Sequence, residues 1–321
     1  MKILVTGANG FIGRHLCFHL TEQKHSVKAV VRQEPKAPII ADEVIVLPDG
    51  SPLTTNLFDS CESIVHLAAR VHILKNNTEN SLEQFRNINV DMTQRWVEAA
   101  IHNGIRRFVL VSSIGMFGPH KSGIPFTETM PVTPIEPYAI SKLEAEDSLS
   151  TSCDGTDMDY VIIRPPLVYG PDAPGNFALL LKLFSLGFPL PFGSLDSQRS
   201  FVSVWNLVDF IRCCLLQAAA KNEVFVVCDK EFITLPEIFQ YLGEGYGRYN
   251  RVFRFPPILL ALAAGLLGKS NAFDKLVADL QVDANKARQI LNWVPPYSAA
   301  DAMRKTGQDF HAMLASNPQN P

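Results

Sequence analysis

The sequence has no long hydrophobic run and no long run of like charges. Its longest apolar stretch, from Ile258 to Gly268, is too short to cross the ~30 Å hydrocarbon layer of a bilayer as a helix, so we expect no membrane span. The net charge is -3, the pI is near 6.2, and no run of five like charges occurs. The chain lacks the basic surface that recognises a phosphate backbone, and we expect no nucleic-acid partner.

Cysteine is sparse and follows no metal-binding or redox pattern. No C-x-x-C occurs, and no histidine stands at zinc spacing from a cysteine, so we expect reduced, mostly buried thiols. The cysteines are Cys17, Cys61, Cys153, Cys213, Cys214 and Cys228. His15 and His19 stand four residues apart, as a metal pair on a helix would. No H-E-x-x-H motif includes them, so we interpret them as helix surface ahead of metal ligands.

The N-terminus shows none of the features of a secretory signal peptide. One lysine and a short apolar run lead directly into Thr6-Gly7, without the longer apolar region and small-residue cleavage site of such a peptide. We therefore expect a cytoplasmic location.

What is present is the composition of a globular protein. The 321 residues are 47% hydrophobic and 19% charged, enough to bury a large core in one large or two closely joined domains. Short runs rich in Val and Ile predict strands buried on both faces, and these alternate with helical patterns such as Asp91 to Asn103. The predicted strands cover 2–6, 27–31, 44–47, 63–67, 108–112 and 160–164. This alternation predicts an α/β fold with a parallel, doubly wound sheet.

After Tyr169 the sequence becomes rich in Gly and Pro, which predicts a smaller lobe over the sheet edge. The runs Phe201 to Leu216 and Glu223 to Cys228 resemble further strand and helix of the sheet domain. The predicted division is therefore a sheet domain over 1–170, to which the chain returns at about 200–228, and a smaller lobe made from 171–199 and 229–321.

A glycine-rich turn follows the first predicted strand. In the run from Thr6 to Gly13, glycines occupy the first, fourth and seventh places after the threonine, at the mouth of a predicted helix. Gly7 would make the tight turn, Gly10 would let a pyrophosphate approach the backbone, and Gly13 would let helix and strand pack closely. An ordinary glycine-rich turn is the alternative, which the strand and helix on either side disfavour.

The second predicted strand ends in Arg32, where an Asp or Glu would hold the adenosine ribose of NAD. A guanidinium pairs with a 2′-phosphate, so Arg32 favours NADP(H), with NAD(H) possible if it is a solvated side chain or stacks on adenine. Leu67, Ala68 and Ala69 end another strand with mostly small side chains, which would leave room for a cofactor at the sheet edge.

Tyr138 and Lys142 form a Y-x-x-x-K pair, which a helix places on one face. A neighbouring ammonium favours the phenolate, so we expect Lys142 to lower the pKa of Tyr138 and make it a usable acid or base. Ser113, after the strand ending at Ser112, could bond the same substrate oxygen. The pair alone could be a surface accident, but its order after the glycine-rich turn and the Ser-Ser strand end favours catalysis.

Together these motifs resemble the extended short-chain dehydrogenase/reductases, which have a Rossmann-type sheet and a smaller C-terminal substrate lobe. Within them the chain resembles the NAD-dependent epimerase/dehydratase family and its bacterial UDP-sugar 4-epimerase or 4-ketoreductase subgroup. The resemblance rests on Thr6 to Gly13, His66 to Val71, Ser112-Ser113, Tyr138-x-x-x-Lys142, Arg164 to Pro171 and Asp283 to Pro295, and it covers nearly the whole chain.

The resemblance implies a catalytic triad of Ser113, Tyr138 and Lys142, with Lys142 also holding the nicotinamide ribose. It places Asn89 near the active site, Asn176 against the nucleotide and Arg199 against the diphosphate, where a loop asparagine and a rim salt bridge are the alternatives. The expected cofactor contacts are Gly7, Asn9, Gly10, Phe11, Ile12, Gly13, Arg32, Leu67, Ala68, Ala69, Asn89, Val111, Tyr138, Lys142 and Pro165. The expected substrate contacts are Ser113, Asn176 and Arg199.

Some residues depart from the family pattern. Gly115 and Leu167 stand where many members carry a polar residue, and no Asp-Glu pair follows the serine, which argues against 4,6-dehydration. The expected function is reduction of a UDP-4-keto-6-deoxy-N-acetylhexosamine by NADPH in surface-polysaccharide synthesis. The alternative is a UDP-sugar 4-epimerase, of the UDP-glucose or UDP-N-acetylglucosamine type, that keeps NAD bound.

Two further alternatives are a non-catalytic cofactor sensor and a reductase of small hydrophobic ketones. The presence of the serine, tyrosine and lysine disfavours the sensor. The resemblance also implies a homodimer formed through helices near 91–103 and 138–149.

Overall fold

A seven-stranded parallel sheet forms the base of the molecule in the computed structural model, which describes residues 1–69, 81–118, 123–248, 252–266, 268, 273 and 278–316. Its strand order is β3-β2-β1-β4-β5-β6-β9, with every neighbouring pair parallel. The strands are β1 (Lys2–Thr6), β2 (Ser26–Val31), β3 (Glu43–Val46), β4 (Ser63–His66), β5 (Arg107–Val111), β6 (Asp159–Arg164) and β9 (Glu223–Val226). The predicted doubly wound sheet is confirmed, and its order reverses between β1 and β4, where such sheets bind ligands.

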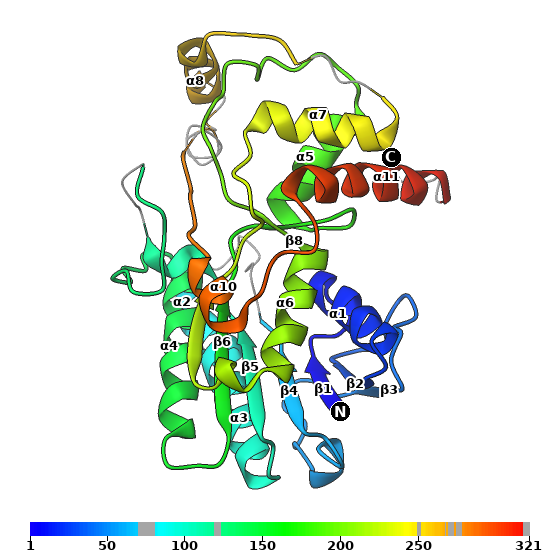
Figure 1. The fold of residues 1–321 in the computed structure, drawn as a ribbon, viewed down its shortest axis with the longest axis vertical. Helices are drawn as coiled ribbons and strands as arrows, with labels where there is room; N and C mark the ends of the chain where they lie inside the picture. Colours follow the sequence, from blue (N-terminus) through cyan, green and yellow to red (C-terminus); the bar gives the residue numbers. More distant parts are fainter. Residues whose placement is uncertain are drawn as a thin grey trace.

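Helices cover both faces of this sheet (Figure 1). Alternate side chains of each strand face opposite ways, so Ile3 and Val5 of β1 join one hydrophobic cluster and Leu4 joins the other. The first cluster includes α1 (Phe11–Glu22) and α6 (Val204–Leu216). The second includes α3 (Met92–His102) and α4 (Pro137–Cys153), beside which α2 (Ser81–Arg86) lies.

A second group of helices lies above the carboxyl ends of the strands (Figure 1). It contains α5 (Gly175–Ser185), α7 (Leu235–Tyr246), α8 (Pro257–Leu266) and α11 (Ala299–Ser316). A short parallel pair, β7 (Val168–Tyr169) with β8 (Val202–Ser203), lies where the chain passes between the two parts. Short 3-10 segments lie at Thr55–Leu57, Ile114–Phe117 and Ala218–Ala220.

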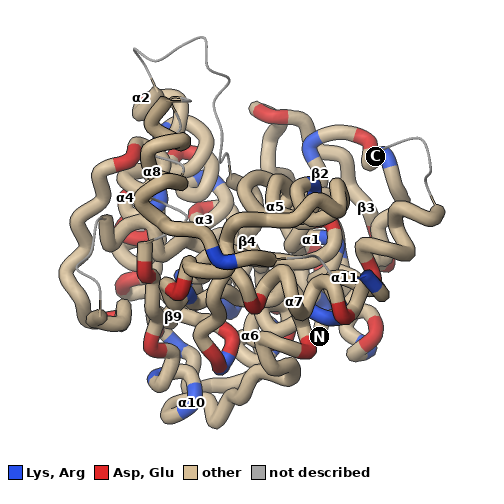
Figure 2. The backbone as a smooth tube through the Cα atoms, turned by 90° about the horizontal axis from the view of Figure 1, so that it is seen from above, with Lys and Arg blue, Asp and Glu red and all other residues tan. Residues whose placement is uncertain are grey.

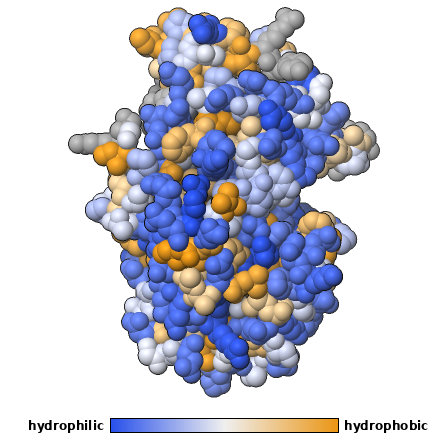
Figure 3. All heavy atoms as spheres, in the orientation of Figure 1, coloured by the Kyte–Doolittle hydropathy of each residue, from blue (hydrophilic) through white to orange (hydrophobic). Residues whose placement is uncertain are grey.

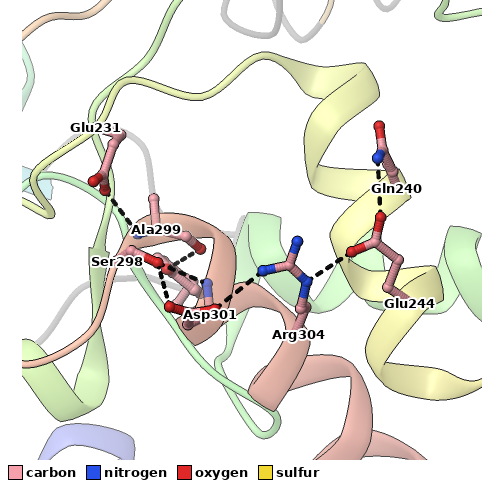
Figure 4. Close-up of polar contacts among 8 residues, drawn as sticks. Glu231, Gln240, Glu244, Ser298, Ala299, Asp301 and Arg304 are labelled. Atoms are coloured by element: carbon pink, nitrogen blue, oxygen red, sulfur yellow. Dashed lines mark hydrogen bonds and ion pairs between the residues drawn. The ribbon is translucent and has the colours of Figure 1, made fainter.

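The upper helices are joined by both packing and charge. A Cβ on Gly245 of α7 would overlap the carbonyl oxygen of Arg304, so only glycine allows α11 this close. Arg304 then bridges Glu244 at 2.7 Å and Asp301 at 3.0 Å (Figure 4). Because these helices have their own hydrophobic cluster, we propose that the predicted division near 170, 199 and 228 is that of the folding units.

One segment of the predicted lobe packs elsewhere. Helix α10 (Asn285–Leu291) lies against the sheet domain, and its Ala287 and Leu291 join the same cluster as α1 and α6, together with Trp293. The chain therefore makes a second return to the sheet, which its composition did not reveal.

All six cysteines are buried free thiols, as the sequence predicts. The predicted helix at 91–103 begins at Met92, after a π-helical turn over Asn87–Asp91. No helix among the described residues is long and apolar enough to cross a membrane. Acidic and basic residues intermingle in the described parts of the chain (Figure 2).

Candidate active site

The turn between β1 and α1 can only be built from glycine at two positions. Gly7 has a φ of +69°, and a Cβ there would lie 2.8 Å from the backbone nitrogen of Ala68. A Cβ on Gly13 would overlap the carbonyl oxygen of Gly7. Gly10 is exposed at the N-cap of α1, where free backbone N–H groups favour an anion.

A cavity of about 460 Å³ opens beside this turn, at the point where the strand order reverses. It brings together seven of the residues predicted to bind cofactor, namely Gly7, Asn9, Gly10, Arg32, Leu67, Ala68 and Ala69. Among its other lining residues are Asp49, Leu53, Met92, Arg95 and Trp96, which sequence reasoning missed. The glycine backbone, apolar walls and polar rim of this cavity fit a dinucleotide.

Arg32 does not stand alone in this cavity. Its guanidinium lies 3.4 Å from the carboxylate of Asp49, and both side chains are more than 60% exposed (62% and 64%). Two hydrogen bonds position the loop that carries Asp49: the Leu47 nitrogen donates to Val31 at 2.7 Å, and Arg95 donates to the Ser51 carbonyl at 2.9 Å. An acidic group is therefore present beside Arg32, but it comes from the loop after β3 and not from the end of β2.

Lys142 is buried at the end of β5. It lies on α4 one turn after Tyr138, and its Nζ atom donates a 2.8 Å hydrogen bond to the carbonyl oxygen of Val111. Burial lowers the pKa of Lys142 to about 8, while the charge of Glu146, a further turn along α4, opposes this shift.

Tyr138 differs from expectation. Burial raises the pKa of its phenol to about 12, whereas the sequence led us to expect a value lowered by Lys142. The physical reason is that the loss of water around the phenol outweighs any effect of the neighbouring ammonium. The ring of Tyr138 also packs edge-on against Phe85 of α2, with their centroids 5.9 Å apart.

Ser113 lies at the same edge of the sheet, on the loop after β5. Its Oγ atom accepts a 3.1 Å hydrogen bond from the Gly115 nitrogen, and the Ile114 nitrogen donates to the Pro165 carbonyl at 3.1 Å. A Cβ on Gly115 would lie 3.9 Å from the Cβ of Ala139, the residue after Tyr138. The loop with Ser113 therefore adjoins the start of α4, and Val111 and Pro165 flank it.

Asn89 is buried in the π-helical turn before α3, a distortion that often occurs at functional sites. Its Nδ2 atom donates to the hydroxyl of Ser141 at 3.0 Å, and that hydroxyl donates to the carbonyl oxygen of Tyr138 at 2.8 Å. Asn89 thus fixes the first turn of α4, while the hydroxyl of Thr93 donates to the Asn89 carbonyl at 2.7 Å.

His66 continues this hydrogen-bonded chain toward the glycine-rich turn. Its ring lies between the hydroxyls of Thr93, at 3.3 Å, and Thr6, at 2.9 Å. Burial, and to a smaller degree the charge of Lys142, lowers the pKa of His66 to about 3, so the imidazole is neutral at physiological pH. Neutral imidazole can both donate and accept, which suits a position between two hydroxyls.

A buried ion pair lies behind Lys142. Arg164, at the end of β6, contacts the carboxylate of Glu146 through two nitrogens, the shortest distance being 2.6 Å. Both side chains are almost fully buried, and the guanidinium lies 5.5 Å from the ring centre of Phe117.

The remaining predicted residues lie farther out. Phe11 packs against Gly170, where a Cβ would lie 3.0 Å from its ring, and Ile12 packs against the first cluster. Asn176 is exposed in the first turn of α5. Arg199 is half-buried and donates to the Ala278 carbonyl at 2.8 Å, where the chain segments around 199, 233 and 280 meet.

The histidines of α1 each face a carboxylate. His15 lies 3.0 Å from Asp172, and His19 lies 3.7 Å from Asp209. The described residues contain no group of three or more His, Cys, Asp or Glu that could hold a metal. Arg70 and Val71, which completed the His66 to Val71 motif, lie outside the described residues.

Comparison with known proteins identifies the family. Residues 3–228 match the model described as "NAD dependent epimerase/dehydratase family". The chain is 34% identical over 316 residues to a UDP-glucose 4-epimerase of Vibrio cholerae, covering 96% of this chain and 95% of that protein. It is 29% identical over 313 residues to a ceramide reductase of Caulobacter vibrioides, covering 91% and 86%.

The fold agrees with this result. The crystal structure of a UDP-glucuronic acid 4-epimerase from Bacillus cereus in complex with NAD superposes with a TM-score of 0.75 at 22% identity, covering 98% of this chain and 99% of that one. The expectation of an extended short-chain dehydrogenase/reductase is confirmed, and the chain belongs to the NAD-dependent epimerase/dehydratase family.

Proposed function

We propose that the protein is a UDP-sugar 4-epimerase that keeps NAD bound. The observation that carries this proposal is the 34% identity, over nearly the full length of both chains, to the Vibrio cholerae UDP-glucose 4-epimerase. It favours the alternative that the sequence left open over the NADPH-dependent ketoreductase. The expected preference for NADP has no support beyond Arg32 itself.

The cavity beside the glycine-rich turn would hold the cofactor. Gly7, Gly10 and Ala68 line the cavity, and the exposed N-cap of α1 at Gly10 would hold the pyrophosphate. Trp96 and Leu53 are among the apolar residues that line the rest. NAD, when bound there, supplies the oxidising and reducing power for carbon 4 of the sugar. The carboxylate of Asp49 beside Arg32 supports NAD, because a negative charge there disfavours a 2′-phosphate.

Three side chains of the protein would then handle the sugar oxygen and its proton. Tyr138 would accept the proton of the 4-hydroxyl and return it, and Ser113 would orient the oxygen. A phenol with a pKa of about 12 needs help to lose its proton. The ammonium of Lys142, one turn further along α4, would supply it by favouring the phenolate.

The substrate diphosphate would lie toward Arg199. Burial lowers the pKa of this arginine, with the charge of Asp279 opposing the shift, so an anionic group beside it would restore favourable charge pairing. Asn176, exposed at the start of α5, would contact the nucleotide. We also keep the homodimer through α3 and α4, and the cytoplasmic location, as proposals.

An assay without added cofactor tests the epimerase. We expect the purified protein to convert UDP-galactose to UDP-glucose, or the N-acetyl pair, and to release NAD when denatured. Tyr138→Phe should lower kcat by roughly 10²- to 10⁴-fold. Tyr297→Phe is the matched control, because Tyr297 is partly exposed on the loop before α11 and should leave kcat unchanged. Absence of any interconversion would contradict the proposal.

The ketoreductase remains a second candidate because one relative, 29% identical, is a ceramide reductase. A reductase must exchange its cofactor at each turnover. Stoichiometric consumption of NADPH with a UDP-4-keto-6-deoxy-N-acetylhexosamine, together with purification free of nucleotide, would favour it over the epimerase.

A further inference from the structure

Helix α8 presents an apolar surface that the rest of the described chain does not cover. Its sequence, Pro257–Leu266, contains no charged or polar side chain, and none of its residues is buried. It lies at the end of the molecule farthest from the seven-stranded sheet, beyond α7 (Figure 1). Hydrophobic residues appear at this end of the space-filling view (Figure 3).

The exposed side chains of α8 share one face. Leu260 packs against the cluster formed by α5, α7 and α11, which fixes the inward side of the helix. At about 100° per residue, the side chains of Ile258, Leu259, Leu262 and Leu266 fall within roughly one third of the circumference, on the side opposite Leu260. Their exposed fractions are 75%, 49%, 60% and 91%, so four large apolar side chains point outward together.

The chain around this face is basic and aromatic. Between Glu244 and Asp274 the sequence has no Asp or Glu but three arginines and one lysine, against a net charge of -3 for the whole protein. Of these, Arg251 and Lys269 lie outside the described residues, and Arg248 donates to the carbonyl oxygens of Phe184 and Ser185. Phe253, which is 44% exposed, and the exposed Arg254 lie just before the helix. We therefore expect a partner for this face to be apolar, with negative charge beside Arg254.

An anionic lipid surface has both properties. A helix with apolar side chains outward, aromatic residues at its end and basic residues nearby is typical of segments that lie in the membrane interface. Ten residues of helix span only about 15 Å, half of the ~30 Å needed to cross, so α8 can lie in the interface but not traverse it.

We propose that α8 docks the upper lobe onto an anionic membrane surface, inserting Ile258, Leu259, Leu262 and Leu266 among the lipid chains. A dimer formed through α3 and α4 would leave this face free, because those helices cover the sheet at the other end of the molecule (Figure 1). The proposal does not depend on which reaction the protein catalyses.

Vesicle flotation tests the proposal. The full-length protein is mixed with vesicles of equal parts phosphatidylglycerol and phosphatidylethanolamine, or of phosphatidylcholine alone. We expect it to float with the anionic vesicles, and to do so less as salt rises. Leu262→Glu/Leu266→Glu should lower the bound fraction by at least about tenfold, because charged side chains replace apolar ones at the inserted face. Arg254→Gln should weaken binding by about fivefold.

A matched control shows whether the loss of flotation is specific to α8 or follows from losing any exposed apolar surface. Leu216 and Val294 are also exposed, at 48% and 55%, but lie at the end of α6 and after α10. Leu216→Glu/Val294→Glu should float like wild type, and both double variants should keep wild-type activity in solution. Failure of wild type to float, or equal flotation of the α8 variant, would overturn the proposal. So would a wild-type oligomer that the α8 variant dissociates without any vesicle binding.

Discussion

The guanidinium of Arg32 lies 3.4 Å from the carboxylate of Asp49, inside the cavity that we assign to the cofactor. The two residues belong to different segments, the end of β2 and the loop after β3. Arg32 therefore faces a carboxylate at the position where a 2′-phosphate would have to bind, and the charge that favours NADP is offset.

The first prediction concerns this pair. Asp49→Asn should strengthen NADP⁺ binding relative to NAD⁺ by about fivefold, because exposed charges at such separations interact by up to about 1 kcal/mol. Titration of each dinucleotide into protein refolded free of bound nucleotide, followed by tryptophan fluorescence, gives the ratio. Asp59→Asn, an exposed acid outside the cavity, should leave it unchanged. A wild-type protein that already prefers NADP⁺ would contradict the role given to Asp49.

The second prediction concerns the buried lysine. Because burial lowers the pKa of Lys142 to about 8 from 10.5, the unfolded chain holds more protons between these values, and wild-type stability should rise with pH across that window. Relative to Lys142→Met, the gain should approach about 3 kcal/mol. Urea unfolding at a series of pH values measures it.

Lys182→Met, on the exposed side of α5, is the control. Its free energy of unfolding should change with pH in the same way as that of wild type. If the stability of Lys142→Met also changed with pH as that of wild type does, Lys142 would not be desolvated as the structure indicates. Lys142→Met should in addition lose activity. Activity reports the catalytic role of Lys142, whereas unfolding reports what its burial costs in stability.

The third prediction concerns His66. The unfolded chain binds a proton near pH 6.5 whereas the folded protein resists it down to about pH 3, so His66 should destabilise the protein progressively as the pH falls below 6.5. Between pH 7 and pH 5 the loss should be about 2 kcal/mol. His66→Phe should lack this loss, although losing the hydrogen bonds of the imidazole to the hydroxyls of Thr6 and Thr93 should cost it about 1–3 kcal/mol at neutral pH.

Thermal and urea unfolding at both pH values compare the two proteins. His102→Gln is the control, because His102 is exposed at the end of α3 and its loss should leave the acid slope of wild type unchanged. Equal slopes for wild type and His66→Phe would show that the imidazole is not held neutral.

The fourth prediction compares two ion pairs of α4. Glu146→Gln leaves Arg164 buried without a carboxylate and should cost about 3–5 kcal/mol of stability. Glu146→Leu/Arg164→Met should recover most of it, since no charge is then buried. Glu144→Gln breaks the exposed pair with Arg86 and should have little effect. A small loss for Glu146→Gln would mean that water reaches Arg164.

The same substitution bears on catalysis. The charge of Glu146 raises the pKa of Lys142, so Glu146→Gln should lower that pKa further and shift the alkaline limb of the activity profile to lower pH. Glu146 therefore acts through Lys142, as a positioning residue. The control Glu144→Gln should leave the pH profile of activity unchanged.

Much of the fold follows from local patterns. Runs of Val and Ile located the strands to within a residue or two, because the strands of a parallel sheet covered on both faces are rich in apolar residues. Gly7 and Gly13 could be assigned their turn and packing roles because no other residue fits there, and in the structure a side chain at either position would collide with neighbouring backbone.

Relationships between distant segments could not be predicted in this way. Asp49 and Arg32 follow two neighbouring strands, β3 and β2, and meet only in the folded protein. His66 of β4 likewise lies between Thr6 of β1 and Thr93 of α3. Neither arrangement leaves a periodic signal in the sequence. The shift of the Tyr138 pKa depended on burial, which sequence spacing does not reveal. The apolar run in α8 would ordinarily indicate a core helix, yet the structure exposes it.

The most decisive test of the epimerase follows the hydrogen atom at carbon 4 of the sugar. UDP-glucose bearing deuterium at that carbon is incubated with the purified protein and no added cofactor, and the product is analysed by NMR. We predict UDP-galactose that retains the deuterium, at a rate that Tyr138→Phe lowers by roughly 10²- to 10⁴-fold. No conversion of this sugar or its N-acetyl form, with NADPH consumed on a 4-keto sugar instead, would contradict the epimerase.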